Sequence, residues 1–212
     1  QQPKNIDLIK KKFHNQKITI VISSAINNKN NELNYCLDQN LTIKHRSEVL
    51  SLIMKSFKSI AVAGSHGKTS TSTFLTTLID LCNKDTSSII GGIIPRYESN
   101  SIIKNSTYLV TEIDESDGTI SKYRPYLGII NNIDFDHCDY YLNINELIKS
   151  LFEFGSNSNI LLTNDDCKVS KKNITSDYTW SIKKTKNVDF AMISKPSLIH
   201  ISEPTRHLDI SY

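Results

Sequence analysis

The feature that most constrains this chain is the stretch from Ser59 to Phe74, where an apolar run leads into a glycine-bracketed turn and then a Ser/Thr-rich segment. This order predicts a buried strand, a tight loop and a helix. Gly64 and Gly67 lack Cβ atoms, so the backbone N–H groups of the loop and the helix start can surround a phosphate. The sequence therefore predicts a phosphate-binding loop, in which Lys68 reaches the terminal phosphates and the Thr69 hydroxyl binds magnesium.

The loop is shorter than the general phosphate-loop pattern. That pattern begins with a glycine at the position that Val62 occupies in this chain. The motif present is Gly64-Ser65-His66-Gly67-Lys68-Thr69-Ser70. The competing interpretation is an ordinary strand-to-helix turn with a surface lysine, but the apolar strand and the Lys-Thr pair favour phosphate binding.

Composition excludes several classes of function. A net charge of +3 over 212 residues is too small and too scattered for a nucleic-acid or acidic-membrane partner. The cysteines at 36, 82, 138 and 167 form no Cys-x-x-Cys pair, which is typical of free thiols in a reducing compartment. No apolar run is long enough to span a membrane and no signal peptide opens the chain. We therefore expect a cytoplasmic protein with neither a nucleic-acid nor a membrane partner.

Strand and helix patterns alternate along the chain, which predicts an α/β fold with a parallel sheet. The expected strands cover 17–22, 41–44, 59–63, 87–94, 108–113, 126–133 and 159–163. The expected helices cover 6–13, 31–39, 47–57, 68–82 and 146–154, with Ser47 as a cap.

Three polar stretches lie just beyond strands whose carboxyl ends meet at one edge of a parallel sheet. They are the phosphate loop, the acidic run 112–117 and the run 134–139. In an extended segment Glu112 and Asp114 point to the same face, so only some of these acids can reach a metal. Taken alone, each run is as readily explained as a solvated loop, but their coincidence with a phosphate loop favours a magnesium site.

Two further features leave alternatives open. Gly91-Gly92 either admits a ligand close to the backbone or forms a bulge. His45 and Arg46 follow a strand and either form a solvated turn, the favoured interpretation, or contact a phosphate.

The motifs 64–70, 112–118 and 132–139, in this order, resemble those of the Mur ligases, which form amide bonds in peptidoglycan precursors at the expense of ATP. The resemblance covers roughly residues 17–166. The Asp-Glu-Ser-Asp run after Glu112, together with the segments 23–26 and 45–50, is most similar to the branch that joins L-alanine to UDP-N-acetylmuramate through an acyl phosphate.

The resemblance implies a partial Rossmann-like amino-terminal domain followed by a central ATPase domain. Residues 1–57 would be the second half of the UDP-sugar-binding domain and 58–197 an incomplete ATP-binding domain. Residues 198–212 show no continuation of the strand-helix pattern, so we expect a disordered or non-native tail. ATP and Mg²⁺ are the implied cofactors, and UDP-N-acetylmuramate and L-alanine the implied substrates.

The resemblance also assigns roles to individual residues. Lys68, Glu112 and His137 would be catalytic, and Thr69, Glu112 and His137 would hold magnesium. The residues implied to bind the nucleotide are Gly64, Ser65, His66, Gly67, Lys68, Thr69, Ser70 and Asn132.

Two other functions compete with this one. The segment around 123–126 and 131–132 is also similar to a recycling ligase that adds a tripeptide to the same sugar nucleotide. A nucleotide-binding module without ligase activity is the alternative from another class. The chain opens at Gln1 and shows no amino-acid-selecting domain, so we expect a fragment that is inactive by itself.

Overall fold

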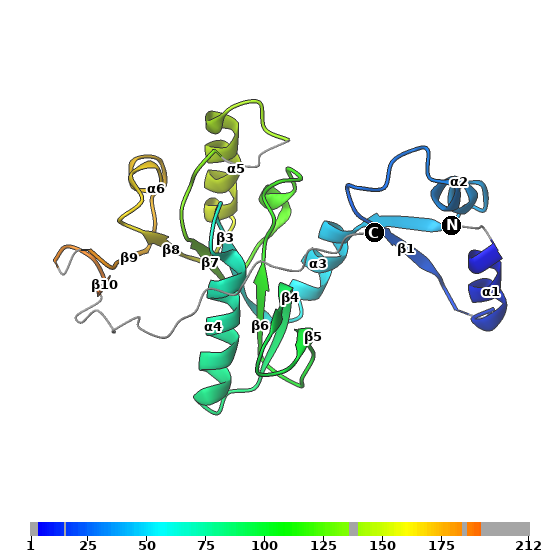
Figure 1. Ribbon diagram of the computed structural model, residues 1–212, viewed down its shortest axis with the longest axis horizontal. Helices are drawn as coiled ribbons and strands as arrows, with labels where there is room; N and C mark the ends of the chain where they lie inside the picture. The colour runs from blue at the N-terminus through cyan, green and yellow to red at the C-terminus, as the bar shows by residue number, and fades with distance from the viewer. Residues whose placement is uncertain (1–3, 15, 136–139, 184–185, 192–212) are drawn as a thin grey trace, which may run out of the picture.

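The computed structural model describes residues 4–14, 16–135, 140–183 and 186–191. Within these residues the chain forms a two-stranded sheet and an eight-stranded sheet. Figure 1 shows the smaller sheet and its helices lying to one side of the larger body, with helix α3 between them. No helix in the described ranges is long and apolar enough to cross a membrane.

The smaller unit alternates helices and strands as the sequence predicts. Its elements are α1 (Lys4–Lys12), β1 (Thr19–Ile22), α2 (Asn31–Asp38), β2 (Thr42–His45) and α3 (Arg46–Met54). Strands β1 and β2 are parallel, and Asn30 caps α2 by accepting a hydrogen bond from the Leu33 N–H. The prediction of Ser47 as the cap of α3 is wrong, because the imidazole of His45 accepts the N–H of Ser47 instead.

The larger sheet has the order β10-β9-β8-β7-β3-β6-β4-β5. Its first elements are β3 (Lys58–Ala63), α4 (Lys68–Leu81), β4 (Thr86–Ile94), β5 (Ser99–Ile102), β6 (Tyr108–Glu112) and η1 (Ile120–Lys122). They are followed by β7 (Leu127–Ile130), α5 (Ile144–Ser156), β8 (Ile160–Asn164), α6 (Lys168–Asn173), β9 (Tyr178–Ser181) and β10 (Phe190–Ala191).

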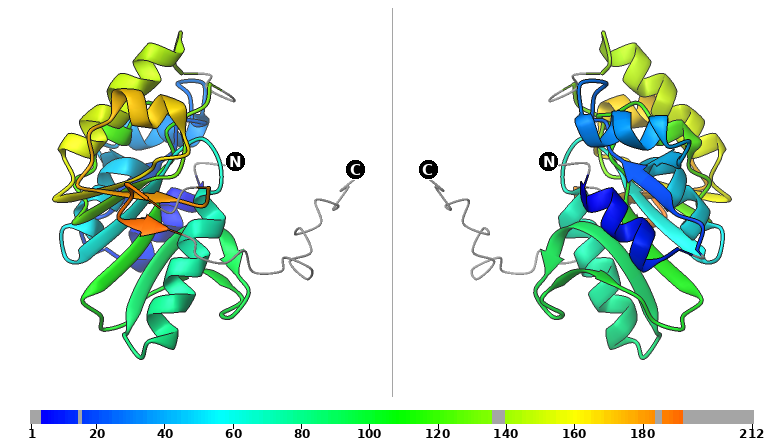
Figure 2. Two further views of the ribbon diagram at one scale, coloured as in Figure 1. Left: turned by 90° about the vertical axis from the view of Figure 1, so that its left-hand side faces the viewer. Right: turned by 90° about the vertical axis from the view of Figure 1, so that its right-hand side faces the viewer.

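The pairing in this sheet confirms the predicted α/β architecture. Every pairing is parallel except that of β5, which runs antiparallel to β4 at the edge. Strand β3 lies between β6 and β7, so the loop that follows it opens at the middle of the sheet edge where the strands end. Figure 2 shows α4 and α5 on different sides of the twisted sheet.

The hydrophobic core lies on the side of the sheet that α5 covers. Leu147, Leu151 and Phe154 are spaced by four and three residues, so they form one apolar stripe of that helix, and all are fully buried. They pack in one cluster with residues of β3, β6 and β7 and with Met54 of α3. Helix α3 therefore packs into the core of the larger sheet, and a domain boundary after residue 57 stays a prediction.

The sequence patterns missed several edge elements. Strands β5, β9 and β10 and helix α6 were not predicted, because each is too short to show a periodic apolar pattern. Such edge elements owe their conformation to pairing with neighbours rather than to a periodic apolar face. The tail predicted from residue 198 lies outside the described residues.

Candidate functional site

The loop between β3 and α4 depends on two glycines. Gly64 has φ of +121° and Gly67 has φ of +76°, both in the range that side chains with a Cβ disfavour. A Cβ on Gly64 would lie 2.8 Å from the backbone oxygen of Asn132. The glycines therefore allow the loop to pack directly against the segment that follows β7.

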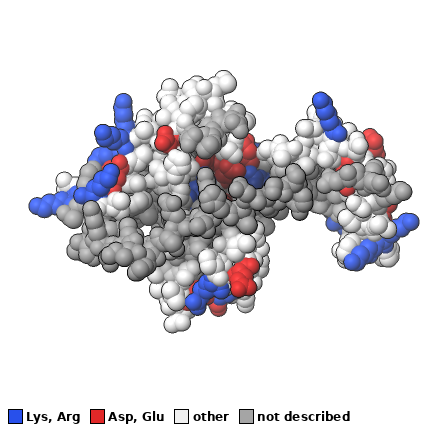
Figure 3. All heavy atoms as spheres, viewed as in Figure 1, with Lys and Arg blue, Asp and Glu red and all other residues white. Residues whose placement is uncertain are grey.

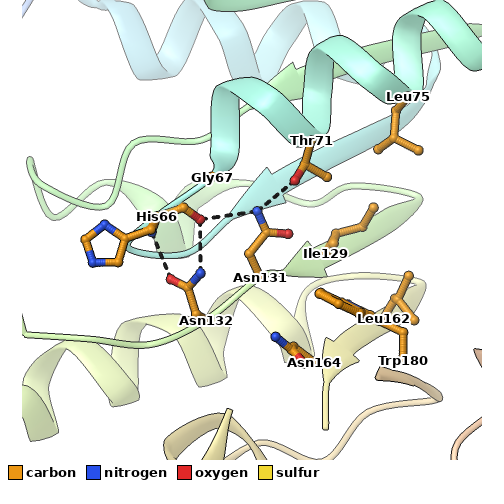
Figure 4. A pocket seen from close by; sticks show the side chains of 10 residues that line it. All are labelled: His66, Gly67, Thr71, Leu75, Ile129, Asn131, Asn132, Leu162, Asn164 and Trp180. Atoms are coloured by element: carbon orange, nitrogen blue, oxygen red, sulfur yellow. Dashed lines mark hydrogen bonds between the residues drawn. The ribbon is translucent and has the colours of Figure 1, made fainter. Parts of the chain in front are cut away.

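Two asparagines after β7 fasten this loop. The Asn132 side chain accepts the N–H of His66 at 2.8 Å and donates to the carbonyl of the same residue at 3.1 Å. The Asn131 amide donates to the His66 carbonyl at 3.3 Å and to the Thr71 hydroxyl at 3.0 Å. Figure 4 shows both amides pointing at the His66 backbone, so Asn132 fixes the shape of the loop.

Ser65 and His66, both predicted to bind the nucleotide, also have partners within the protein. The Ser65 hydroxyl donates to the Asp134 carbonyl at 2.7 Å and accepts the Asp134 N–H at 2.8 Å. The His66 ring is exposed and lies 3.9 Å from the Asp134 carboxylate. These contacts stabilise the loop, and they occupy the Ser65 hydroxyl.

The start of α4 has no side-chain cap among the described residues, so its backbone donors can bind a ligand. The first N–H groups of any helix have no partner within the helix, and in α2 and α5 Asn30 and Asn143 supply a side-chain cap. Gly67 occupies the cap position of α4 and supplies none. Thr69 and Ser70 lie in this exposed first turn, where the positive end of the helix dipole favours an anion.

Lys68 lies at the loop with two defined acceptors. Its Nζ donates to the Gly64 carbonyl and to the Glu115 carboxylate, both at 2.9 Å. The Glu115 side chain is only 7% exposed. Burial raises the pKa of the Glu115 carboxyl above its ordinary value, and the adjacent Lys68 ammonium opposes that rise.

Glu112 and Thr69 meet at the glycine pair of β4. A Cβ on Gly91 would overlap the Glu112 carboxylate, and a Cβ on Gly92 would lie 2.6 Å from Cγ2 of Thr69. The β4–β5 register also shifts between Ile89 and Ile94. The glycine pair therefore forms an irregularity in the strand that makes room for the two predicted metal ligands.

These two side chains fit a magnesium ion by their chemistry. Oε2 of Glu112 is buried and has no hydrogen-bond partner in the described ranges, and Thr69 is exposed. Carboxylate and hydroxyl oxygens are the hard ligands that Mg²⁺ prefers. The third predicted ligand, His137, lies outside the described residues, and the described ones include no metal-binding group of three or more His, Cys, Asp or Glu.

Cavities flank the loop on two sides. One of about 530 Å³ is lined by residues that include Lys68, Gly91, Glu112 and Asp114, which confirms that Glu112 and Asp114 face the same side. The other, of about 450 Å³, lies between the start of α4 and strands β7 to β9. Figure 4 shows Asn164 and Trp180 at the far wall of this second cavity.

The strand end at residues 45 and 46 is not the solvated turn that the sequence favoured. The Arg46 guanidinium donates to Asp114 at 2.9 Å and to Asp117 at 3.4 Å, and the Ser24 hydroxyl donates to Asp117 at 3.4 Å. These contacts join the small sheet to the acidic run of the large one. Figure 3 shows acidic side chains near the middle of the molecule, where the two parts meet.

Hydrogen bonds keep the Asp114 carboxyl ionised at this junction. Burial would raise the pKa of Asp114, but hydrogen bonds from Ser116 and from Arg46 hold it below the ordinary value. The Asp114 carboxylate therefore remains ionised beside the arginine. The pattern of alternating faces indicated where Asp114 points, but no local signal indicated its partner.

Glu115 and Asn131 are the site residues to which sequence reasoning gave no role. Glu115 was one acid among several in a run, and Asn131 was one of two adjacent asparagines. Their contacts are to residues 47 and 60 positions away, Lys68 and Thr71. Only their positions after sheet strands pointed toward the loop: Asn131 directly follows β7, and Glu115 lies in the run that follows β6.

Profiles of known families match most of the chain. The Mur ligase middle domain matches residues 62–198, and a profile described as Mur ligase family, catalytic domain, matches residues 2–58.

Curated relatives give the same family. A UDP-N-acetylmuramate--L-alanine ligase of Prochlorococcus marinus subsp. pastoris is 56% identical over 94% of this chain and 42% of its own length. A protein with the same name from another strain of Prochlorococcus marinus is 45% identical over 93% of this chain and 40% of its own. The chain therefore spans about two fifths of the length of the curated relatives it matches.

Solved structures share the fold. A UDP-N-acetylmuramate-alanine ligase from Thermotoga maritima superposes with a TM-score of 0.72 at 22% identity, covering 78% of this chain and 39% of its own. A UDP-N-acetylmuramate:L-alanyl-gamma-D-glutamyl-meso-diaminopimelate ligase from Neisseria meningitides gives 0.73 at 18% identity, covering 86% and 62%. At this identity the likeness concerns the fold alone, so it does not separate the two branches.

Proposed function

The chain belongs to the Mur ligase family, and from this premise we propose that the intact protein joins L-alanine to UDP-N-acetylmuramate in an ATP-dependent ligation. The reaction is a step in the synthesis of peptidoglycan precursors, and its proposed location is the cytoplasm. The identity of 56% to a relative named for this reaction supports the choice of branch.

The observation that carries the proposal is the convergence of a phosphate loop and a buried acid at one edge of the sheet. Lys68 follows β3, and Glu112 ends β6, the strand paired with β3. Both side chains line the same cavity of about 530 Å³. A lysine, free helix N–H groups and a carboxylate are the parts that phosphoryl transfer requires.

The chain's own residues would act mainly by position and charge. The N–H groups of the first turn of α4 bind phosphate oxygens, and the Lys68 ammonium contacts the phosphate that is transferred. Asn131 and Asn132 keep the loop in the binding conformation. Thr69 and Glu112, with His137, would hold Mg²⁺, which neutralises charge on the phosphates when bound.

The first experiment measures phosphate release by the full-length protein from Mg-ATP and UDP-N-acetylmuramate, with L-alanine or with the tripeptide as second substrate. We expect release that depends on L-alanine. Stimulation by the tripeptide alone would move the protein to the recycling branch. Tight binding of Mg-ATP without release under any condition would identify a non-catalytic nucleotide-binding module.

Lys68 is the residue on which this function depends most. We expect Lys68→Ala to lower kcat for phosphate release by at least about a hundredfold, since it removes the charge nearest the transferred phosphate. Lys84→Ala is the matched control, because Lys84 is exposed beyond the far end of α4. Phosphate release by Lys68→Ala at the rate of this control would exclude the role given to Lys68.

A further inference from the structure

We propose that Glu115 is a positioning residue that holds the ammonium group of Lys68 at the phosphate loop with one N–H donor left for a phosphate oxygen. The kinetic part of this inference rests on the proposed function. The structural part concerns only the contact between two side chains.

The contact leaves the lysine incompletely paired. A lysine ammonium has three N–H donors. Glu115 and the Gly64 carbonyl accept two of them, each at 2.9 Å, and no third acceptor is found among the described residues. The Gly64 carbonyl belongs to the loop itself, so these two bonds fix the ammonium to the base of the phosphate-binding backbone.

Glu115 is suited to this task because it is itself held in place. The turn that carries it is closed by a bond from the Gly118 N–H to the Glu115 carbonyl at 3.2 Å. On either side of Glu115, Asp114 accepts the Ser116 N–H and Asp117 accepts the Thr119 N–H. A carboxylate on such a turn provides a fixed anchor for a long, flexible side chain.

The acids of the run 112–117 form ion pairs with two different basic residues. Asp114 and Asp117 pair with Arg46, whereas Glu115 alone pairs with Lys68. Glu115 is itself buried, and its Oε2 has no hydrogen-bond partner among the described residues. A buried carboxylate with only one oxygen bonded is costly for folding and typical of functional sites.

Because Glu115 holds it, the Lys68 side chain is already ordered before the reaction begins. A free lysine samples many rotamers, and ordering it during the reaction carries an entropy cost that corresponds to a factor of about ten. Lys68 forms its closest phosphate contact as charge develops on the transferred group. Loss of Glu115 should therefore lower kcat more than it raises KM for ATP.

The test compares Glu115→Ala and Glu115→Gln with wild type in the full-length protein. The first readout needs no nucleotide: it is the rate at which acetic anhydride acetylates Lys68, followed by mass spectrometry of the digested protein. Glu115→Ala should increase this rate about tenfold, because the amine loses the acceptor that holds it and becomes more accessible. Glu115→Gln should stay within about threefold of wild type, since its amide oxygen can still accept from Nζ.

The second readout is phosphate release. Glu115→Ala should lower kcat about tenfold with a change in KM for ATP below about threefold, and Glu115→Gln should restore most of the loss. If Glu115 contributed only to stability, Glu115→Ala would not lower kcat selectively over KM, and Glu115→Gln would not restore kcat.

Lys104 provides the control within the same molecule. It donates to Asp80 at 2.8 Å on the opposite end of α4, so its acetylation should not change in Glu115→Ala. In Asp80→Ala the acetylation of Lys104 should rise and that of Lys68 should not.

Two results would overturn the proposal: unchanged acetylation of Lys68 in Glu115→Ala, or a glutamine variant as reactive as the alanine one. If wild type releases no phosphate with any acceptor, the proposed function fails. The acetylation rates then still decide whether Glu115 positions Lys68.

Discussion

At the scale of single residues, Gly64 tolerates the least change in the phosphate loop. Its φ of +121° lies outside the left-handed helical region that Asn or Asp can adopt. The space beside it is closed by the backbone of Asn132, which cannot rotate away as a side chain can. Gly67 has φ of +76°, and a Cβ added to it would lie 3.5 Å from a side-chain nitrogen of Asn131, which is ordinary contact.

This difference predicts the order of two stability losses. We expect Gly64→Ala to lower the free energy of unfolding by about 2–4 kcal/mol and Gly67→Ala by about 1–2 kcal/mol. Urea denaturation of both variants and wild type measures the two losses. Equal losses, or a larger loss for Gly67→Ala, would contradict a loop whose tightest backbone packing is at Gly64.

At the scale of elements, α4 is the helix on which the site depends, and its two ends differ. The first turn has no side-chain cap and is open to a ligand. The last turn is tied to the β4–β5 hairpin, because Asp80 accepts from Lys104 at 2.8 Å and from Arg96 at 3.2 Å. The last turn is therefore held by ion pairs, whereas the first turn is the part of the helix that we propose binds phosphate.

The ion pairs of this last turn predict a pH dependence. The hydrogen bond from Lys104, the largest cause, lowers the pKa of Asp80 from its ordinary 3.8 to about 2 in the folded protein. Because the folded pKa lies below the unfolded one, Asp80 stabilises the fold above pH 3.8 and loses this effect as pH falls toward 2. We expect wild type to be more stable than Asp80→Asn at about pH 6, with a difference that shrinks between about pH 4 and about pH 2.

Urea denaturation at a series of pH values measures this difference. Asp85→Asn is the matched control, because its carboxylate is exposed and lies 3.6 Å from the same lysine. Its difference from wild type should be smaller at about pH 6. A difference for Asp80→Asn that stays constant down to about pH 2 would show that the carboxylate is not held ionised by its partners.

At the scale of the whole molecule, one arginine joins the two sheets. Arg46 begins α3, which follows the small sheet directly, and its guanidinium reaches two acids that follow β6. The Arg46 side chain is 51% exposed, so solvent screens its ion pairs. Met54, at the other end of α3, packs into the core of the large sheet. The position of the small sheet thus depends on apolar packing at one end of α3 and on charge at the other.

We expect a modest and salt-sensitive coupling across this junction. A double-mutant cycle of Arg46→Gln and Asp114→Asn should give about 0.5–1 kcal/mol near 0.1 M salt, and clearly less at 1 M, where the Debye length falls to about 3 Å. Urea denaturation of the four proteins at both salt concentrations gives the coupling energy. Arg124 and Asn157 form the control pair, since a charge-to-amide bond at 2.6 Å should show less salt dependence. An Arg46–Asp114 coupling that does not respond to salt would contradict an ion pair at this place.

The sequence by itself determined the α/β alternation, the phosphate loop and the position of Glu112. These follow from local patterns: the apolar run before Gly64, the residues of the loop, and the alternation of side chains along an extended segment. The sequence also indicated the family, because the order and spacing of its motifs can be read directly from the residues. His137, predicted from the same motifs, lies outside the described residues and stays a prediction.

Only the tertiary structure determined which polar side chains contact one another. Glu115 meets Lys68, Asn131 meets Thr71, and Gly91 makes room for Glu112. Neither composition nor periodicity encodes these contacts, because each joins two segments that are far apart in the chain. They depend on the order of strands in the sheet, which places β6 and β7 on either side of β3. Local patterns specify what a segment becomes, whereas strand order, set by burial of the whole sheet, specifies what lies beside it.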